Sequence, residues 1–271
     1  MPLALLALTI SAFAIGTTEF VIVGLVPTIA EQLAISLPSA GLLVSIYALG
    51  VAVGAPVLTA LTGRFPRKQL LVALMVLFTA GNILAWQAPD YTTLVIARLL
   101  TGLAHGVFFS IGSTIATSLV PKEKAASAIA IMFGGLTVAL VTGVPLGTFI
   151  GQHFGWRETF LAVSLLGVIA LVASLLLVPS SIPGRASASL SDQVKVLTHP
   201  RLLLIYAVTA LGYGGVFTAF TFLAPMMQEL AGFSPGAVSW ILLGYGISVA
   251  IGNIWGGKLA DKHGGVPALK F

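Results

Sequence analysis

Three ionisable side chains interrupt long apolar stretches of the 271-residue chain: Glu19, Arg98 and His105. A carboxyl group can bind a proton or a cation, a guanidinium stays positively charged, and an imidazole can exchange a proton near neutral pH. Inside a membrane helix a charged residue costs about 2.5–3.5 kcal/mol, so such residues usually face a watery cavity or a partner. We therefore interpret these three residues as candidates for binding protons or a cation.

The spacing of these residues predicts that they share one chamber. Arg98 and His105 are seven residues apart, which places them on one face of a helix. Counted from the expected helix ends at about 1.5 Å per residue, all three lie at compatible depths. In this hypothesis Glu19 is the protonation or cation-recognition site, Arg98 keeps it charged until substrate or a conformational change weakens their contact, and His105 relays protons. The alternative is a static ion pair that fixes helix packing, with His105 as a hydrogen-bonded packing residue.

Apolar helices must position these residues, because the composition is that of a membrane protein. The chain is 58% hydrophobic and 8% charged, whereas soluble domains carry roughly 25% charged residues. Windows without Asp, Glu, Lys or Arg separate small clusters of charge, and each is long enough for the ~20 residues of a spanning helix. We predict an all-α polytopic membrane protein with eight transmembrane helices, at about 3–30, 40–61, 69–88, 92–118, 126–151, 159–179, 202–228 and 237–257.

Several classes of function are not expected. The net charge of +5 comes without a basic stripe long enough to follow phosphates, so we expect no nucleic-acid partner. The absence of cysteine excludes disulfides, thiolate metal sites and a cysteine nucleophile. The sequence has no Gly-x-x-x-x-Gly-Lys-Ser/Thr, His-Glu-x-x-His or Gly-x-Ser-x-Gly motif, and its four histidines fall in different segments. We therefore expect no ATP-driven mechanism, enzymatic reaction, metal or cofactor.

The basic residues predict the orientation of the helices, because Lys and Arg concentrate on the cytoplasmic side of membrane proteins. Arg157 lies alone on one side, and Arg98 lies within the membrane. The other side carries eleven of the 13 basic residues, namely Arg64, Arg67, Lys68, Lys122, Lys124, Arg185, Lys195, Arg201, Lys258, Lys262 and Lys270. We predict a multi-pass protein with a cytoplasmic N-terminus, and we expect its first apolar run to stay uncleaved because it is too long for a signal peptide.

The chain also contains an internal repeat. A shift of 198 residues aligns the last two predicted helices with the first two without a gap, including the pairs Pro27 and Pro225, Glu31 and Glu229, and Tyr47 and Tyr245. Parallel repeats related by an axis along the membrane normal are typical of transporters. We predict a six-helix bundle at 1–179, a cytoplasmic linker at 180–201 and an incomplete second bundle at 202–271.

The segment Gly257-Lys-Leu-Ala-Asp261-Lys262-His-Gly264 resembles the cytoplasmic loop signature Gly-x-Leu-Ala-Asp-Arg-x-Gly of the major facilitator superfamily, with Lys262 at the Arg position. The chain is similar to the bacterial drug:proton antiporter branch of that family and to its arabinose-efflux-permease-like proteins. The resemblance implies that Asp261 pairs with a basic group as a latch between two rocking bundles. The alternative is an ordinary polar turn at the membrane surface.

The loop after the second helix matches this signature in part. Arg64, Arg67 and Lys68 keep its basic residues, but Gly63 stands where the family has Asp and Pro66 where it has Gly. These basic residues are therefore expected to serve the topology.

Helix 4 carries Leu94-x-x-x-Arg98-x-x-Thr101-Gly102, which resembles the family's Arg-containing motif on that helix, with Thr101 in place of Gln. The family places helices 1 and 4 beside a central cavity. The resemblance therefore implies that Glu19 and Arg98 lie next to the substrate path.

Helix 5 carries Gly143-Val-Pro145-Leu-Gly147, which resembles the family's antiporter signature, a motif associated with exporters. Pro145 should kink this helix. Small residues every four positions let another backbone approach closely. We expect the stripe of small residues on helix 5 to meet a similar stripe on helix 8, and the alternative is that the stripes serve packing alone. The stripe on helix 5 consists of Gly135, Ala139, Gly143, Gly147 and Gly151, and the stripe on helix 8 consists of Gly244, Ser248, Gly252 and Gly256.

Two further helix faces carry predictions. Gly50 and Gly54 on helix 2 are expected to lack their partner, because the family has twelve spans and the chain has eight. The aromatic face of helix 7 is expected to line a cavity for hydrophobic solutes. An equal alternative is that it faces lipid or packs against another helix. This face consists of Tyr206, Tyr213, Phe217 and Phe220.

The resemblance implies a secondary active transporter of the bacterial inner membrane. It would export small drug-like or sugar-like molecules in exchange for protons, by alternating access within the lipid bilayer. Glu19 slightly favours cationic or amphipathic solutes, and sugars or nucleosides are the alternative substrates. Because helices 9–12 are not found, the other expectation is a truncated, non-transporting membrane fragment.

Overall fold

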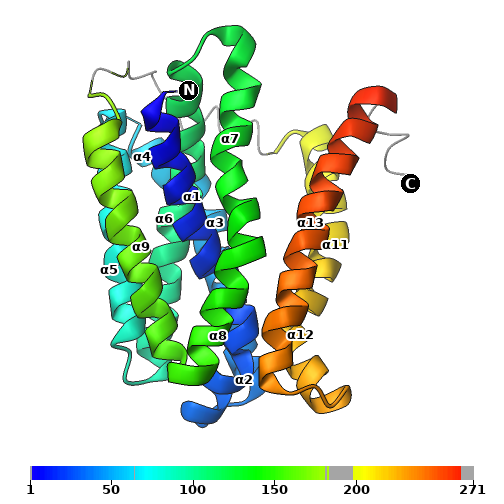
Figure 1. The fold of residues 1–271 in the computed structure, drawn as a ribbon. Helices are drawn as coiled ribbons and strands as arrows, with labels where there is room; N and C mark the ends of the chain where they lie inside the picture. Colours follow the sequence, from blue (N-terminus) through cyan, green and yellow to red (C-terminus); the bar gives the residue numbers. More distant parts are fainter. Residues whose placement is uncertain (1, 64, 181, 183–197, 264–271) are drawn as a thin grey trace.

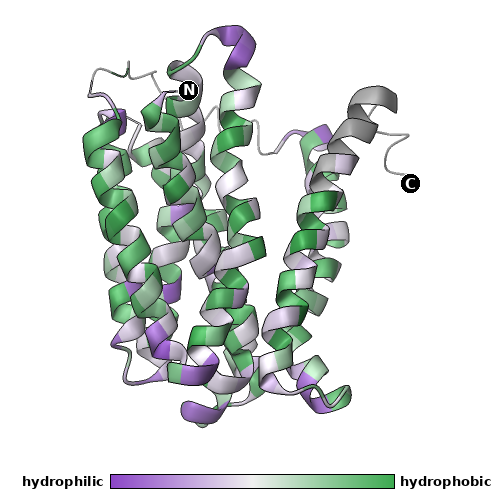
Figure 2. Ribbon diagram, viewed as in Figure 1, coloured by the Kyte–Doolittle hydropathy of each residue, from purple (hydrophilic) through white to green (hydrophobic). Residues whose placement is uncertain are grey.

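The computed structural model describes residues 2–63, 65–180, 182 and 198–263. Within these ranges it contains eight helices that are long and apolar enough to cross a membrane, and no strand (Figure 1). Apolar residues cover the lengths of the helices and polar residues gather at their ends (Figure 2). The all-helical fold and the eight spans predicted from the charge-free windows are confirmed.

The first four spans are α1 (Leu3–Phe20) with α2 (Ile22–Gln32), α3 (Leu37–Val53) with the π-helical η1 (Gly54–Leu58) and α4 (Thr59–Leu61), α5 (Arg67–Trp86), and α6 (Tyr91–Ser118). After the short η2 (Lys122–Lys124) come α7 (Ala125–Val138) with the π-helical η3 (Ala139–Gly143) and α8 (Val144–Phe154), and then α9 (Trp156–Leu177). The last two spans are α11 (Pro200–Thr221) with α12 (Leu223–Pro225) and the π-helical η4 (Met226–Leu230), and α13 (Pro235–His263). The N-terminus and α4 lie at one end of the molecule, and α2, α8 and α12 lie at the other (Figure 1).

The first span is interrupted just after Glu19, where the sequence predicted one continuous helix. α1 ends at Phe20, and the amide of Gly24 bonds the carbonyl of Val21, three residues back, at 3.1 Å. Pro27 inside α2 lacks the amide hydrogen that would bond the carbonyl oxygen of Val23, so the helical hydrogen bonds are also incomplete just after the interruption. Carbonyl groups in the last turn of a helix lack regular partners. The interruption therefore leaves hydrogen-bond acceptors beside Glu19.

Each π-helical turn lies at a proline. Pro56 is within η1, Pro145 follows η3 by two residues, and Pro225 directly precedes η4. A proline removes one backbone donor, and a wider turn accommodates the loss. At Pro145 the sequence predicts a kink, and the structure has the π-helical turn η3, which ends two residues before this proline.

Glycines bring α3 and α6 together. A Cβ atom on Gly50 would lie 2.7 Å from the carbonyl oxygen of Leu99, and one on Gly54 would lie 2.8 Å from that of Leu103. Only glycine permits this approach, because it has no Cβ atom. The prediction that Gly50 and Gly54 lack a partner was wrong, since α6 fills that place.

The glycine stripe of the fifth span packs on the first span rather than on the eighth. A Cβ atom on Gly143 would collide with Thr17 of α1, whereas one on Gly244 of α13 would have no atom within 4 Å. The fifth and eighth spans do meet, but at Gly246, where a Cβ atom would collide with the carbonyl group of Leu140 in η3. The predicted meeting of the two stripes was therefore wrong. A period of small residues indicates a close contact without identifying the partner.

Two adjacent glycines of α7 test this packing. A Cβ atom at Gly135 would collide with the carbonyl oxygen of Thr9 on α1, whereas one at Gly134 would have no atom within 4 Å. We expect Gly135→Ala to lower the melting temperature in detergent, because overpacking costs about 1–3 kcal/mol. The matched control Gly134→Ala should leave the melting temperature unchanged or raise it slightly, since alanine favours helices. Tryptophan fluorescence follows the unfolding of each variant. Equal changes in the two melting temperatures would contradict this packing.

Candidate functional site

The three residues predicted from the sequence come together between α1, α3 and α6. Glu19 lies one residue before the end of α1, and Arg98 and His105 lie on α6. His105 Nδ1 is 3.7 Å from Glu19 Oε2, which is an ion-pair distance when the imidazole is protonated. Arg98 is 1% exposed, while the side chains of Glu19 and His105 are 20% and 11% exposed. The side chain of Glu19 can therefore be reached in part from outside the cluster, whereas the guanidinium of Arg98 is almost inaccessible.

Arg98 binds the backbone at the end of α1. Its guanidinium donates to the carbonyl oxygens of Thr18 at 2.7 Å, Glu19 at 3.4 Å and Leu43 at 3.3 Å. Its Cζ atom lies 4.2 Å above the ring of Tyr47, which is a cation–π contact. The partner predicted for Arg98 was the Glu19 carboxylate, and the structure gives it these acceptors and the ring instead. The interruption after α1 explains the difference, because it leaves carbonyl groups at the negative end of a helix.

Tyr47 of α3 belongs to this cluster, although the sequence did not single it out as a site residue. Its hydroxyl group lies 2.9 Å from His105 Nδ1, and the two ring centroids are 5.6 Å apart. When Nδ1 carries no proton, the tyrosine hydroxyl donates to it, and when Nδ1 carries a proton, the ring donates to the tyrosine oxygen. With both ring nitrogens protonated, the imidazolium also attracts the Glu19 carboxylate. The one signal for Tyr47 in the sequence was its match to Tyr245 in the repeat.

A buried chain of hydrogen bonds links the cluster to α5. Thr18 Oγ1 donates to Asn82 Oδ1 at 2.6 Å, and Asn82 Nδ2 donates to the carbonyl oxygen of Phe78 at 2.8 Å. Thr18 and Asn82 are fully buried. Because Arg98 bonds the carbonyl group of Thr18, this residue connects α1 to both α5 and α6. Fully satisfied buried networks of this kind hold their members in one arrangement.

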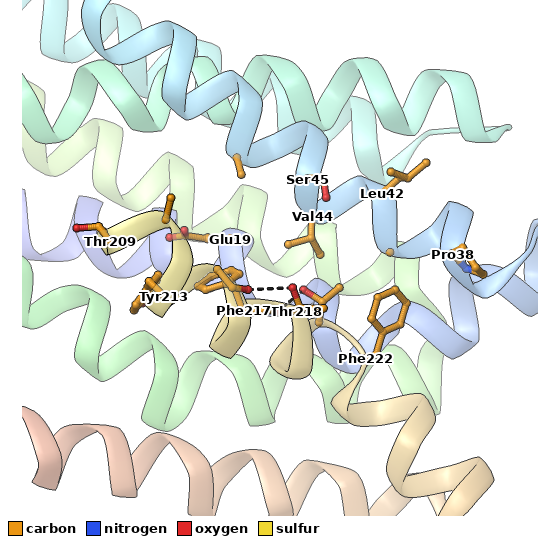
Figure 3. A pocket seen from close by; sticks show the side chains of 15 residues that line it. Glu19, Pro38, Leu42, Val44, Ser45, Thr209, Tyr213, Phe217, Thr218 and Phe222 are labelled. Carbon is orange, nitrogen blue, oxygen red and sulfur yellow. Dashed lines mark hydrogen bonds between the residues drawn. The ribbon is translucent and has the colours of Figure 1, made fainter. Parts of the chain in front are cut away.

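A cavity of about 800 Å³ opens beside Glu19, between α1, α3 and α11 (Figure 3). Its volume is within the ~300–1,000 Å³ typical of small-molecule sites. In the described part of the chain, Glu19 is the only charged side chain that lines it, and Tyr213, Phe217 and Phe222 add aromatic rings. Tyr213 and Phe217 belong to the aromatic face predicted on helix 7, whereas Tyr206 of that face does not line the cavity. An acid in an apolar wall can bind a proton or the cationic group of a small solute.

The residues of the helix 5 motif lie outside this cavity. Gly143 and Gly147 are buried against Thr17 and Val21 of the first span. Pro145 is buried and lines a separate cavity of about 750 Å³ between α8 and α13. In the structure the two glycines therefore pack spans together.

The loop signatures lie at the ends of spans. Arg67 is buried at the first residue of α5, and Lys68 beside it is partly exposed. α13 runs past the end predicted at residue 257. Its last turns contain three residues of the other signature, Gly257, Asp261 and Lys262. Their side chains, together with Arg64, Gly264 and most of the predicted linker (181 and 183–197), lie outside the described residues. Within the described ranges, no group of three or more His, Cys, Asp or Glu side chains is arranged to hold a metal ion.

Comparison with known proteins identifies the family. Residues 8–271 match the model of the Major Facilitator Superfamily. The chain belongs to this superfamily. It is 55% identical over 260 residues to an uncharacterized MFS-type transporter, YtbD, of Bacillus subtilis (strain 168), and 46% identical over 258 residues to the inner membrane transport protein YdhP of Escherichia coli (strain K12). These alignments cover 96% and 95% of this chain and 66% of each relative, so the chain spans just under two thirds of their length.

Solved structures share this fold at low sequence identity. A bacterial homolog of the human lysosomal transporter Spinster, in an inward-facing and unoccupied conformation, superposes with a TM-score of 0.74 at 20% identity, over 96% of this chain and 62% of that one. A D-xylose–proton symporter gives a TM-score of 0.72 at 17% identity, over 95% of this chain and 68% of that one. The arrangement of the eight spans is therefore that of major facilitator proteins.

The hydrogen bonds of Arg98 predict that lysine cannot replace it, because lysine lacks the planar fork that reaches carbonyl groups on two helices. We expect Arg98→Lys to destabilise the protein by on the order of 2 kcal/mol, since buried acceptors lose charged donors. Arg157→Lys is the matched control, because both hydrogen bonds described for Arg157 go to the single carbonyl oxygen of Ala88. Melting temperatures in detergent compare the two variants. An equally small decrease in both would show that the bonds of Arg98 do not hold α1 and α3.

Proposed function

We propose that this protein is a secondary active transporter that moves small organic cations with apolar groups out of a bacterial cell in exchange for protons. Residues 1–179 form one bundle, residues 202–271 belong to a second, and 180–201 link them on the cytoplasmic side of the inner membrane, where the N-terminus also lies. The observation that carries the proposal is one carboxylate, Glu19, which lines a cavity between the spans and lies 3.7 Å from His105. Membership of the superfamily, and an inner membrane transport protein among the relatives, support it.

Competition for one carboxylate is the proposed basis of the coupling. Because Glu19 is the only charged side chain among the described residues that line the cavity, a cationic solute and a proton would neutralise the same group and exclude each other. Within the ranges that the structure describes, the other titratable or charged groups that face this site are Arg98 and His105 on α6, Tyr47 on α3 and Tyr213 on α11. Arg98 is bound to backbone acceptors, so exchange at the carboxylate leaves the guanidinium in place.

The walls of the cavity favour an amphipathic cation over a sugar or a nucleoside. The hydroxyl groups of Thr209, Thr218 and Thr221 donate to carbonyl groups one turn earlier in α11. Among the described residues that line the cavity, this leaves the hydroxyl groups of Ser45 and Tyr213 as donors for a solute. A polyhydroxylated solute would leave several of its own polar groups without partners, which is costly in a buried site. The rings of Tyr213 and Phe217 can instead pack on a cation or an apolar group.

Contacts between the first six spans and the last two support alternating access. α13 packs on η3, which lies between α7 and α8 in the middle of the fifth span. α12 packs on α2, and α13 also packs on α8, at the end of the molecule opposite the N-terminus (Figure 1). Ser239 of α13 donates to Gln152 of α8 at 3.3 Å in the same region. In the proposal this end faces outward, and the two bundles rock about the close approach of Gly246 to Leu140.

The sequence signatures have proposed roles in this rocking. Asp261 would be the acid of a latch between the cytoplasmic ends of the bundles, within the loop signature that also comprises Gly257, Lys262 and Gly264. The basic residues of the other loop, Arg64, Arg67 and Lys68, would serve the topology. The helix 5 motif would let the fifth span bend at the π-helical turn that precedes its proline; it comprises Gly143, Pro145 and Gly147.

Export of ethidium, a planar aromatic cation, tests the proposal. Bacterial cells that make the protein should retain less ethidium, measured by its fluorescence, than cells without it. Cells that make Glu19→Gln should retain as much as cells without the protein, because an amide cannot exchange a proton for a cation. Glu31→Gln at the exposed end of α2 is the matched control and should export normally.

A proton gradient should be needed for this export, so a protonophore should abolish it. Export that persists in Glu19→Gln, or after collapse of the gradient, would contradict proton exchange at Glu19. Unchanged retention in cells that make the unaltered protein would contradict cation export itself.

A further inference from the structure

A second cavity adjoins the first along α11, where Tyr213 and Phe217 line both. It has a volume of about 410 Å³ and is lined by residues of α1, α7, η3, α11 and α13. Its walls are apolar and aromatic apart from the hydroxyl groups of Thr137 and two tyrosines. Phe220 and Tyr245 stack with their ring centroids 4.6 Å apart and their planes at 20°, which gives the cavity a flat aromatic wall.

Two aromatic rings lie close together where the two cavities share lining residues. Phe20 of α1 and Phe217 of α11 lie with their ring centroids 6.0 Å apart. Phe217 lines both cavities, as does Tyr213 one turn earlier, whereas Glu19 lines only the first and Phe20 only the second. Successive residues of a helix point about 100° apart. This is why the carboxylate and the ring at the end of α1 face different cavities.

The internal repeat shows that the two halves of the chain supply different chemistry here. At the shift of 198 residues, Glu19 corresponds to Phe217 and Tyr47 corresponds to Tyr245. Tyr47 belongs to the cluster around the acid, whereas Tyr245 forms the stacked wall of the second cavity. The first repeat therefore contributes a charged half-site and the second contributes an aromatic half-site.

We infer that the second cavity is a subsite for an aromatic group of the solute, and that Phe217 sets how large a group the protein admits. The inference rests on the proposed function, in which the cationic group of the solute binds at Glu19. A solute with one ring packs against Phe217 within the first cavity. A solute with two linked rings reaches the stacked wall of the second cavity only when Phe217 moves aside, and rings gain from packing on such a wall.

Two quaternary ammonium ions distinguish the cavities, because both carry a fixed charge. Benzyltrimethylammonium has one ring, and (4-phenylbenzyl)trimethylammonium has two. Isothermal titration calorimetry measures the dissociation constant of each ion for the purified protein in detergent. We expect Phe217→Ala to improve the affinity for the two-ring ion relative to the one-ring ion by about tenfold. Phe222→Ala, the same truncation at a residue that lines only the first cavity, should leave the ratio of affinities unchanged.

Two further variants make the test independent of one substitution. Val249→Phe, added to Phe217→Ala, refills the second cavity and should cancel the gain of the two-ring ion. Phe217→Trp enlarges a side chain that lines both cavities and should lower the ratio below that of the unaltered protein. The tryptophan variant provides the test if the alanine variant does not fold.

The possible outcomes separate this inference from the function on which it rests. An unchanged ratio in the Phe217 variants, or a gain that Val249→Phe does not cancel, would overturn the aromatic subsite while both ions still bind through Glu19. Failure of both ions to bind the unaltered protein, or binding that Glu19→Gln does not weaken, would overturn the proposed function and the subsite together.

Discussion

Three helices meet at the guanidinium of Arg98, and the geometry of the candidate site depends on this meeting. The guanidinium donates to the carbonyl groups of Thr18 and Glu19 at the end of α1 and of Leu43 on α3, and it covers the ring of Tyr47. A cation is favourable at the negative end of a helix, and the fork of an arginine satisfies several acceptors at once. α1 can therefore end between the two faces of the membrane, because Arg98 supplies its last carbonyl groups with hydrogen-bond donors. Lipid tails have no such donors.

Because the guanidinium of Arg98 donates its hydrogen bonds to backbone carbonyl oxygens, the carboxylate of Glu19 can interact with other partners. His105 approaches it from α6 at 3.7 Å, and a cavity of about 800 Å³ opens on its other side. Tyr47 links these parts, since it lies under the guanidinium and bonds the imidazole. The proposed exchange therefore separates a fixed positive charge, which holds the helices, from an acid whose charge can change.

The eight spans could be predicted because charges are costly in a bilayer, so charge-free windows mark the helices. The common depth of Glu19, Arg98 and His105 followed from counting residues along those helices. The partners of Arg98 could not be predicted in this way, because they are backbone groups freed by an interruption that the apolar run 3–30 does not reveal. Tyr47 was missed because a tyrosine in an apolar helix carries no charge to mark it. The partner of Gly143 was misassigned because helix periodicity gives a face but not the neighbour that the face contacts.

Counting the protons released on binding tests the central claim most directly, namely that a proton and a cationic solute compete for Glu19. Benzyltrimethylammonium is added to the purified protein in weakly buffered solution with a pH-sensitive dye, over a series of starting pH values. The account predicts release of up to about one proton per bound ion over part of this range, and no release from Glu19→Gln. Equal release from the two proteins, or binding to the unaltered protein without release at every pH, would contradict it.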